Sequence, residues 1–99
     1  NYPYDLEILE TENTIMLSQL TNGKLIEQSR EHQNGYDYNR CLSSFVMDGY
    51  QLTMLCYTFI ADSALYTLSF TAQPGKFEPF REEATKIMDS FRLPPRKPV

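Results

Sequence analysis

Two dipeptides, Asn34-Gly35 and Asp48-Gly49, constrain the fold of this chain more than any other feature of its sequence. Gly, Asn and Asp tolerate the positive φ angles of a type I′ turn, so each dipeptide predicts a tight β-hairpin between its flanking runs. A weaker turn is expected at Asp62-Ser63, between two runs rich in Thr, Tyr, Phe and Leu. Three turns predict a meander of four antiparallel strands.

Two-residue loops at these turns also predict which side chains share a face of the sheet. One face collects mostly large apolar groups and is expected to face the core. Its rows are Tyr38, Phe59 and Tyr66; Arg40, Tyr57 and Leu68; and Leu42, Leu55 and Phe70. The first strand, expected from Leu25 to Gln33, is polar, which suits a strand at the edge of the sheet.

A helix is predicted after Gln73-Pro74-Gly75, where the apolar period changes from that of a strand to that of a helix. It is expected to run from about Phe77 to Phe91 and to end before Pro94-Pro95. Its predicted stripe toward the large apolar face is Phe77, Phe80, Ala84, Ile87 and Phe91. Alanine at Phe80 or Phe91 would then cost about 3–5 kcal/mol.

The stretch before the first strand predicts a second helix. Leu6, Leu9, Asn13, Met16 and Leu20 share one helical face, and Thr21-Asn22-Gly23 provides a C-terminal stop. A hairpin of Leu6–Glu10 against Thr14–Ser18 is the alternative. The predicted fold class is therefore α+β, with one domain over residues 1–93 and a proline-rich tail over residues 94–99.

Size and charge narrow the possible partners. A chain of 99 residues with 41% hydrophobic residues is expected to form one domain with one core. Its net charge of -4 and its pI of about 4.8 argue against nucleic acid as a ligand. No apolar run approaches the roughly 20 residues that a transmembrane helix needs.

Catalytic and metal-binding patterns are not found in the sequence. His32 is the one histidine, and the expected register pairs it with Asp37 on the surface of the hairpin. A zinc site needs three or four ligands, whereas this chain offers one histidine and two mid-strand cysteines without close spacing. We therefore expect no enzyme activity, no cofactor and no metal.

Cys41 and Cys56 are predicted to lie directly opposite each other on the smaller, more polar face of the sheet. Such a hydrogen-bonded cross-strand pair has Cα atoms roughly 5.5 Å apart, which a disulfide tolerates only with strain. Two states stay open at this point: two half-buried free thiols, or a labile bridge that an oxidising compartment would favour.

The strand sequence Tyr66-Thr67-Leu68-Ser69-Phe70-Thr71-Ala72 and the closing Ile87–Leu93, with Ser90-Phe91 inside it, resemble the Mog1/PsbP/DcrB-like superfamily. The likeness covers about Lys24 to Leu93 and is closest to the bacterial branch. It implies a shortened α/β/α sandwich. The functions it implies are diverse: a Ran-binding protein, an extrinsic photosystem subunit, bacterial envelope lipoproteins and chaperone-like adaptors for secreted toxins.

Two functions of different class remain open. The first is a non-catalytic module, of a cell-envelope or adaptor protein, that binds a protein or peptide through one sheet face or edge; an uncovered face or edge would also allow a homodimer. The second is a small-molecule binder whose pocket between helix and sheet is lined by Tyr38, Arg40 and Tyr57. The surroundings of Arg40 distinguish the two hypotheses. An unpaired, buried guanidinium would indicate a ligand site, whereas a guanidinium paired with a carboxylate would have a structural role.

Overall fold

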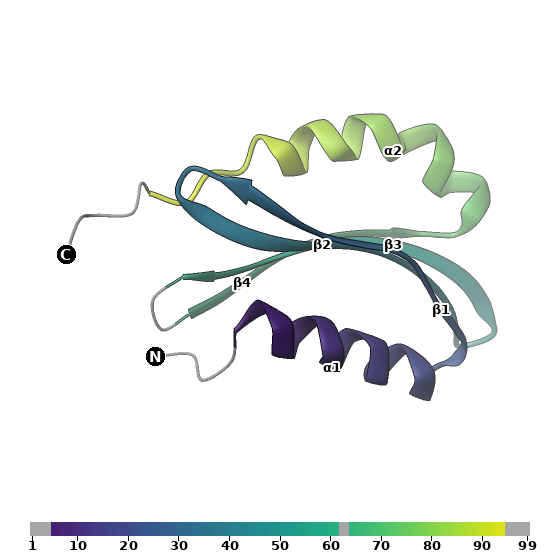
Figure 1. The fold of residues 1–99 in the computed structure, drawn as a ribbon. Helices are drawn as coiled ribbons and strands as arrows, with labels where there is room; N and C mark the ends of the chain where they lie inside the picture. Colours follow the sequence, from purple (N-terminus) through teal and green to yellow (C-terminus); the bar gives the residue numbers. More distant parts are fainter. Residues whose placement is uncertain (1–4, 62–63, 95–99) are drawn as a thin grey trace.

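The computed structural model describes residues 5–61 and 64–94 and has three layers. One antiparallel sheet, with strand order β1-β2-β3-β4, lies between two helices on opposite faces (Figure 1). The elements are α1 (Leu6–Gln19), β1 (Thr21–Gln33), β2 (Tyr36–Met47), β3 (Tyr50–Ala61), β4 (Ala64–Ala72) and α2 (Pro74–Asp89). The predicted α+β meander with a helix at each end is confirmed.

The first two hairpins have the predicted turn conformation. The φ angles are 56° at Asn34, 86° at Gly35, 53° at Asp48 and 81° at Gly49, all positive as a type I′ turn requires. The predicted register between β2, β3 and β4 is confirmed. Asp62 and Ser63 lie outside the described residues, but Ala61 pairs with Ala64 as that predicted turn requires.

The junction between α1 and β1 differs from the prediction. Thr21-Asn22-Gly23 was expected to stop the helix in a loop, with the first strand starting at Leu25, whereas β1 already begins at Thr21. The chain doubles back so closely here that a Cβ on Gly23 would lie 1.9 Å from the Leu17 carbonyl oxygen. Gly23 is therefore needed for this close approach, and the alternative N-terminal hairpin is wrong.

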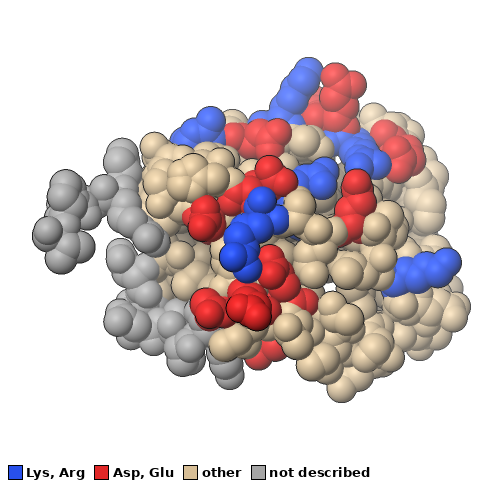
Figure 2. All heavy atoms as spheres, in the orientation of Figure 1, with Lys and Arg blue, Asp and Glu red and all other residues tan. Residues whose placement is uncertain are grey.

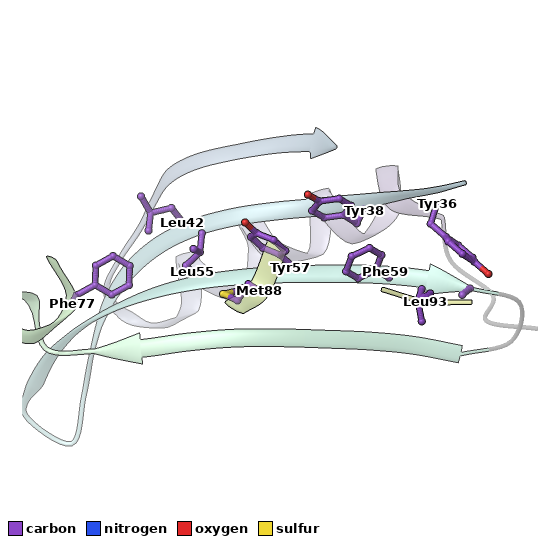
Figure 3. Packing of buried hydrophobic residues seen from close by; sticks show 10 residues of the cluster. Tyr36, Tyr38, Leu42, Leu55, Tyr57, Phe59, Phe77, Met88 and Leu93 are labelled. Carbon is purple, nitrogen blue, oxygen red and sulfur yellow. The ribbon is translucent and has the colours of Figure 1, made fainter. Parts of the chain in front are cut away.

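The core lies between α2 and the large apolar face of the sheet. Tyr38 stacks on Phe59 with ring centroids 4.5 Å apart, and Phe70 stacks on Phe77 at 4.9 Å. Tyr66, predicted in the same row as Tyr38 and Phe59, is 42% exposed because β4 is an edge strand. The buried cluster, most of which Figure 3 labels, is Tyr36, Tyr38, Leu42, Leu55, Tyr57, Phe59, Ala61, Phe77, Met88 and Leu93.

The buried stripe of α2 is rotated from the predicted one. Phe77 is buried as expected, but Phe80 is 54% exposed and Ile87 is 67% exposed. Met88 takes the buried position one residue after Ile87, and half-buried Arg81 follows Phe80. At the first of these positions the Arg81 guanidinium lies 3.8 Å from Glu27 of β1, so a charged residue takes the place that apolar periodicity assigned to Phe80.

The sheet-facing stripe of α1 follows the prediction at Leu9 and Asn13 and departs from it at Met16. Leu9 and Leu17 are its buried residues, and Met16, which was predicted to face the sheet, is exposed. The helix packs mainly against β1 and β2. Two buried leucines on a 14-residue helix form a narrow apolar contact, so α1 depends on polar contacts as well.

The rotation of α2 can be tested with two phenylalanine substitutions. Phe77→Ala should destabilise the chain by about 3–5 kcal/mol, because a fully buried ring leaves a cavity. Phe80→Ala, the matched control from the outer side of the same helix, should cost less than about 1 kcal/mol. Chemical denaturation measures both, and equal losses for the two variants would contradict the observed helix orientation.

Candidate functional site

The two helices cover different halves of the sheet. α1 lies over β1 and β2 on one face, while α2 contacts β3 and β4 on the other (Figure 1). Each face is therefore left with a half that its helix does not cover. On the α2 side the open part is β1 together with Arg40 of β2, because Tyr36, Tyr38 and Leu42 of β2 are buried in the core. On the α1 side the open half belongs to β3 and β4.

The uncovered half on the α2 side is charged, and we call it the charged surface. Glu27, Glu31 and Arg40 lie here, beside a groove of about 470 Å³. The groove brings together the three predicted pocket residues, Tyr38, Arg40 and Tyr57, with other side chains of β1, of α2 and of the segment that follows α2. These others are Glu31, Gln33, Thr85, Asp89 and Arg92.

Polar groups in this groove already bind one another. The Tyr57 hydroxyl donates to Asp89 Oδ1 at 2.6 Å. Arg40 Nη1 lies 3.9 Å from Glu27 Oε2, and Arg81 Nη2 lies 3.8 Å from the same oxygen. Arg40 is therefore paired with a carboxylate, as expected for a structural role and not for a ligand site. The groove lies between the C-terminal half of α2 and strands β1, β2 and β3.

Burial raises the pKa of Tyr57 to about 12, with a further increase from its hydrogen bond to Asp89. Burial also raises the pKa of Tyr38. Both phenols thus stay protonated at neutral pH. A protonated Tyr57 is what donates to Asp89 and holds α2 on the sheet.

The uncovered half on the α1 side carries no charged strand residue, and we call it the uncharged surface. Its β4 side chains are all exposed, while the neighbouring Leu68 and Phe70 on the other face are half-buried under α2. Met47 and Tyr50 extend the surface at the β2–β3 turn, and both are exposed. Met16 is exposed on the flank of α1 opposite Glu10, which pairs with Arg30 of the edge strand β1. The strand residues are Leu52, Met54, Cys56, Ile60, Leu65, Thr67, Ser69 and Thr71.

A network of amide side chains positions α1 beside the uncharged surface. Asn13 Nδ2 donates to Gln28 Oε1 and to Asn39 Oδ1, both at 3.1 Å, and Asn39 Nδ2 donates to Gln28 Oε1 at 3.0 Å. Glu10 adds an ion pair with Arg30 of β1 at 3.0 Å. These contacts hold α1 over β1 and β2, and Asn13, which interrupts the apolar stripe in the sequence, is the residue that sequence analysis undervalued.

The two cysteines lie where the covered and uncovered halves of the α1-side face meet. Cys41 of β2 pairs with Cys56 of β3 as predicted, and both thiols are free. Burial raises the pKa of Cys41 to about 11, with a smaller contribution from Cys56, and burial raises the pKa of Cys56 as well. The free-thiol alternative is the one observed.

Other chemistry-bearing residues lie on the surface. His32 Nδ1 is 2.8 Å from Asp37 Oδ1 in an exposed cross-strand pair, as predicted. Across residues 5–61 and 64–94 there is no group of three or more His, Cys, Asp or Glu side chains that could hold a metal, and no helix is long and apolar enough to cross a membrane. Figure 2 shows acidic and basic side chains interspersed over the side of the molecule it presents.

Comparison with known proteins identifies the fold. No family model matches the chain, and no curated protein matches it. A crystal structure of a Pseudomonas aeruginosa protein, PA94, described as a protein of unknown function and putative regulator, is similar with a TM-score of 0.82 at 13% identity. The match covers 92% of this chain and 63% of that one, so this chain spans less than two thirds of its length.

Removal of the Tyr57 hydroxyl should change the response of stability to alkaline pH. The raised pKa of Tyr57 stabilises the folded state below about pH 10, and this contribution is lost as pH rises from about 10 to about 12. Tyr57→Phe should therefore lose about 1–2 kcal/mol at pH 7 and show a shallower decline between those pH values. Denaturant unfolding at several pH values measures this, with Tyr50→Phe as an exposed control that should keep the wild-type decline.

Disruption of the amide network should weaken the packing of α1 on the sheet. Asn13→Ala leaves the buried Oδ1 of Asn39 without its donor and removes one of the two donors to Gln28 Oε1, at an expected cost of about 1–3 kcal/mol. Thr11→Ala, on the exposed side of the same helix, should change stability by less than about 0.5 kcal/mol. Thermal unfolding compares them, and an Asn13 variant as stable as the Thr11 variant would show that the network does not hold the helix.

Proposed function

We propose that this chain is a non-catalytic interaction module that binds an apolar segment of another protein on its uncharged surface. One observation carries the proposal: half of a sheet face is open and carries no charge, although charged residues are frequent elsewhere on the molecule. Its exposed apolar side chains, Leu65, Met47 and Tyr50, lie among the hydroxyl groups of Thr67, Ser69 and Thr71. Exposed apolar groups bordered by polar residues are typical of protein-binding sites. The charged surface, by contrast, has its polar groups paired within the molecule.

The shape of this region suits a segment lying along the sheet. Strand β3 contributes Leu52, Met54 and Ile60 to this surface and β4 contributes Leu65, while α1 packs on the neighbouring strands β1 and β2. Methionine side chains are flexible and polarizable, so they adapt to partners of different shape. Such a surface favours recognition by apolar contact over recognition by charge.

The superfamily resemblance supports the same class of function. Among the functions it implies are envelope lipoproteins and chaperone-like adaptors, which act through binding. A chaperone-like adaptor needs an apolar surface that binds an apolar segment of its partner and shields that segment from water. The uncharged surface meets that requirement, and a second copy of this chain is the competing occupant.

Small-molecule binding in the groove is the second candidate function. It is favoured by the way Tyr38, Arg40 and Tyr57 line one groove. A ligand there would compete with the Tyr57–Asp89 hydrogen bond and with the pairing of Arg40 to Glu27. Because ligand binding would break contacts that hold α2 on the sheet, the groove is the weaker candidate site.

Binding of a synthetic amphipathic peptide, uncharged and with leucines along one helical face, tests the proposal. Met16→Glu and Leu65→Glu should each weaken the binding by about 10- to 100-fold, the equivalent of one buried apolar side chain. Ile87→Glu, which adds the same charge to an exposed apolar position on α2, should leave the affinity unchanged.

The variants also separate the competing explanations. If Ile87→Glu weakens peptide binding as much as Leu65→Glu, the effect is one of charge and the uncharged surface is not the site. Sedimentation equilibrium of the peptide-free chain identifies the other occupant: a dimer that Leu65→Glu dissociates would assign the surface to self-association and contradict the proposal.

A further inference from the structure

Three sulfur-bearing side chains occupy neighbouring positions on the α1-side face of β2 and β3. Cys41 lies directly opposite Cys56, and Met54 lies two residues before Cys56 on the same face, opposite Ser43. Cys41 is buried and Cys56 is half-buried. The register thus gathers two thiols and a thioether at one place.

Two buried hydroxyl groups accompany the sulfurs. Thr58 Oγ1 lies 3.7 Å from Cys56 Sγ. Ser43, which is fully buried, has an Oγ with no hydrogen-bond partner within residues 5–61 and 64–94, and it follows Cys41 on the same face of β2. A buried hydroxyl without a partner is costly in a folded protein, and both hydroxyls can donate to a sulfur that becomes negatively charged.

The spacing of the thiols suits a shared cation better than a disulfide. In a hydrogen-bonded cross-strand pair the Cα atoms are about 5.5 Å apart and the side chains stand side by side from the sheet. A disulfide needs the sulfurs at about 2.05 Å and strains this geometry. A metal–thiolate bond of about 2.3 Å on each side bridges sulfurs roughly 4–5 Å apart.

The donor set selects a soft cation of low coordination number. Zinc requires three or four strong ligands, and within the part of the chain that the structure describes no third His, Cys, Asp or Glu joins the two thiols. Thiolate and thioether ligands select Cu(I), which is satisfied by two or three sulfurs. We propose that Cys41, Cys56 and Met54 form a binding site for Cu(I).

Binding balances without any redox step. Two S–H bonds break, two S–Cu bonds form, two protons pass to solvent, and the Met54 thioether adds as a neutral ligand. Copper stays in the +1 state throughout. Cys56 is half-buried and borders the uncharged surface, which gives the cation a path to the buried Cys41.

Competition for Cu(I) against the chromophoric chelator bicinchoninate, with the reduced full chain under anaerobic conditions, tests the site. The chain should take up one Cu(I) and release two protons. Cys56→Ser should weaken Cu(I) binding by at least about 100-fold and Met54→Leu by about tenfold. Met47→Leu, which changes an exposed methionine outside the site, should retain wild-type affinity.

Two results would overturn the assignment. The first is a wild-type chain that competes for Cu(I) no better than a Cys56→Ser variant whose circular dichroism shows it to be folded. The second is an X-ray absorption spectrum of the copper-loaded chain that shows nitrogen and oxygen neighbours without sulfur. Either result would leave the cysteines as small buried side chains only.

Discussion

The positive φ angles at Asn34-Gly35 and Asp48-Gly49 set the register of β1, β2 and β3, and the other features of the molecule depend on that register. A shift by one residue in a hairpin would turn one strand over relative to its neighbour. Tyr38 and Leu42 of β2 would then no longer share a face with Leu55, Tyr57 and Phe59 of β3, and the amide network between β1, β2 and α1 could not form. Turn chemistry at four residues therefore decides where both helices can pack.

Neither helix lies over the middle of the sheet, and polar contacts explain why. Asn13 and Glu10 tie α1 to β1 and β2, while Phe77, Met88 and the Tyr57–Asp89 hydrogen bond tie α2 to the sheet on the other face. The halves left open differ in chemistry because β1 is a charged edge strand and β4 is an uncharged one. This asymmetry gives the molecule one surface suited to an apolar partner.

Sequence patterns predicted the parts of this fold that depend on local geometry. The hairpins, the pairing of Cys41 with Cys56 and the existence of both helices follow from turn residues and periodicity. The half-burial of Arg81 in place of Phe80 could not be predicted, because its partner Glu27 is distant in sequence. Asn13 was predicted on the sheet-facing side of α1, but its partner Asn39 was not. Tyr38, Arg40 and Tyr57 line one groove, but their partners Asp89 and Glu27 were not predicted from the sequence.

The four methionines report on both faces of the sheet in one measurement. Met16, Met47 and Met54 border or line the uncharged surface, and Met88 is buried under α2. In methyl NMR spectra of the methionine-labelled chain, a water-soluble paramagnetic reagent should broaden the Met16 and Met47 signals strongly, Met54 partly and Met88 least. If the Met16 and Met47 methyl groups are instead as protected as that of Met88, the α1-side face is not open and the account of this surface is wrong.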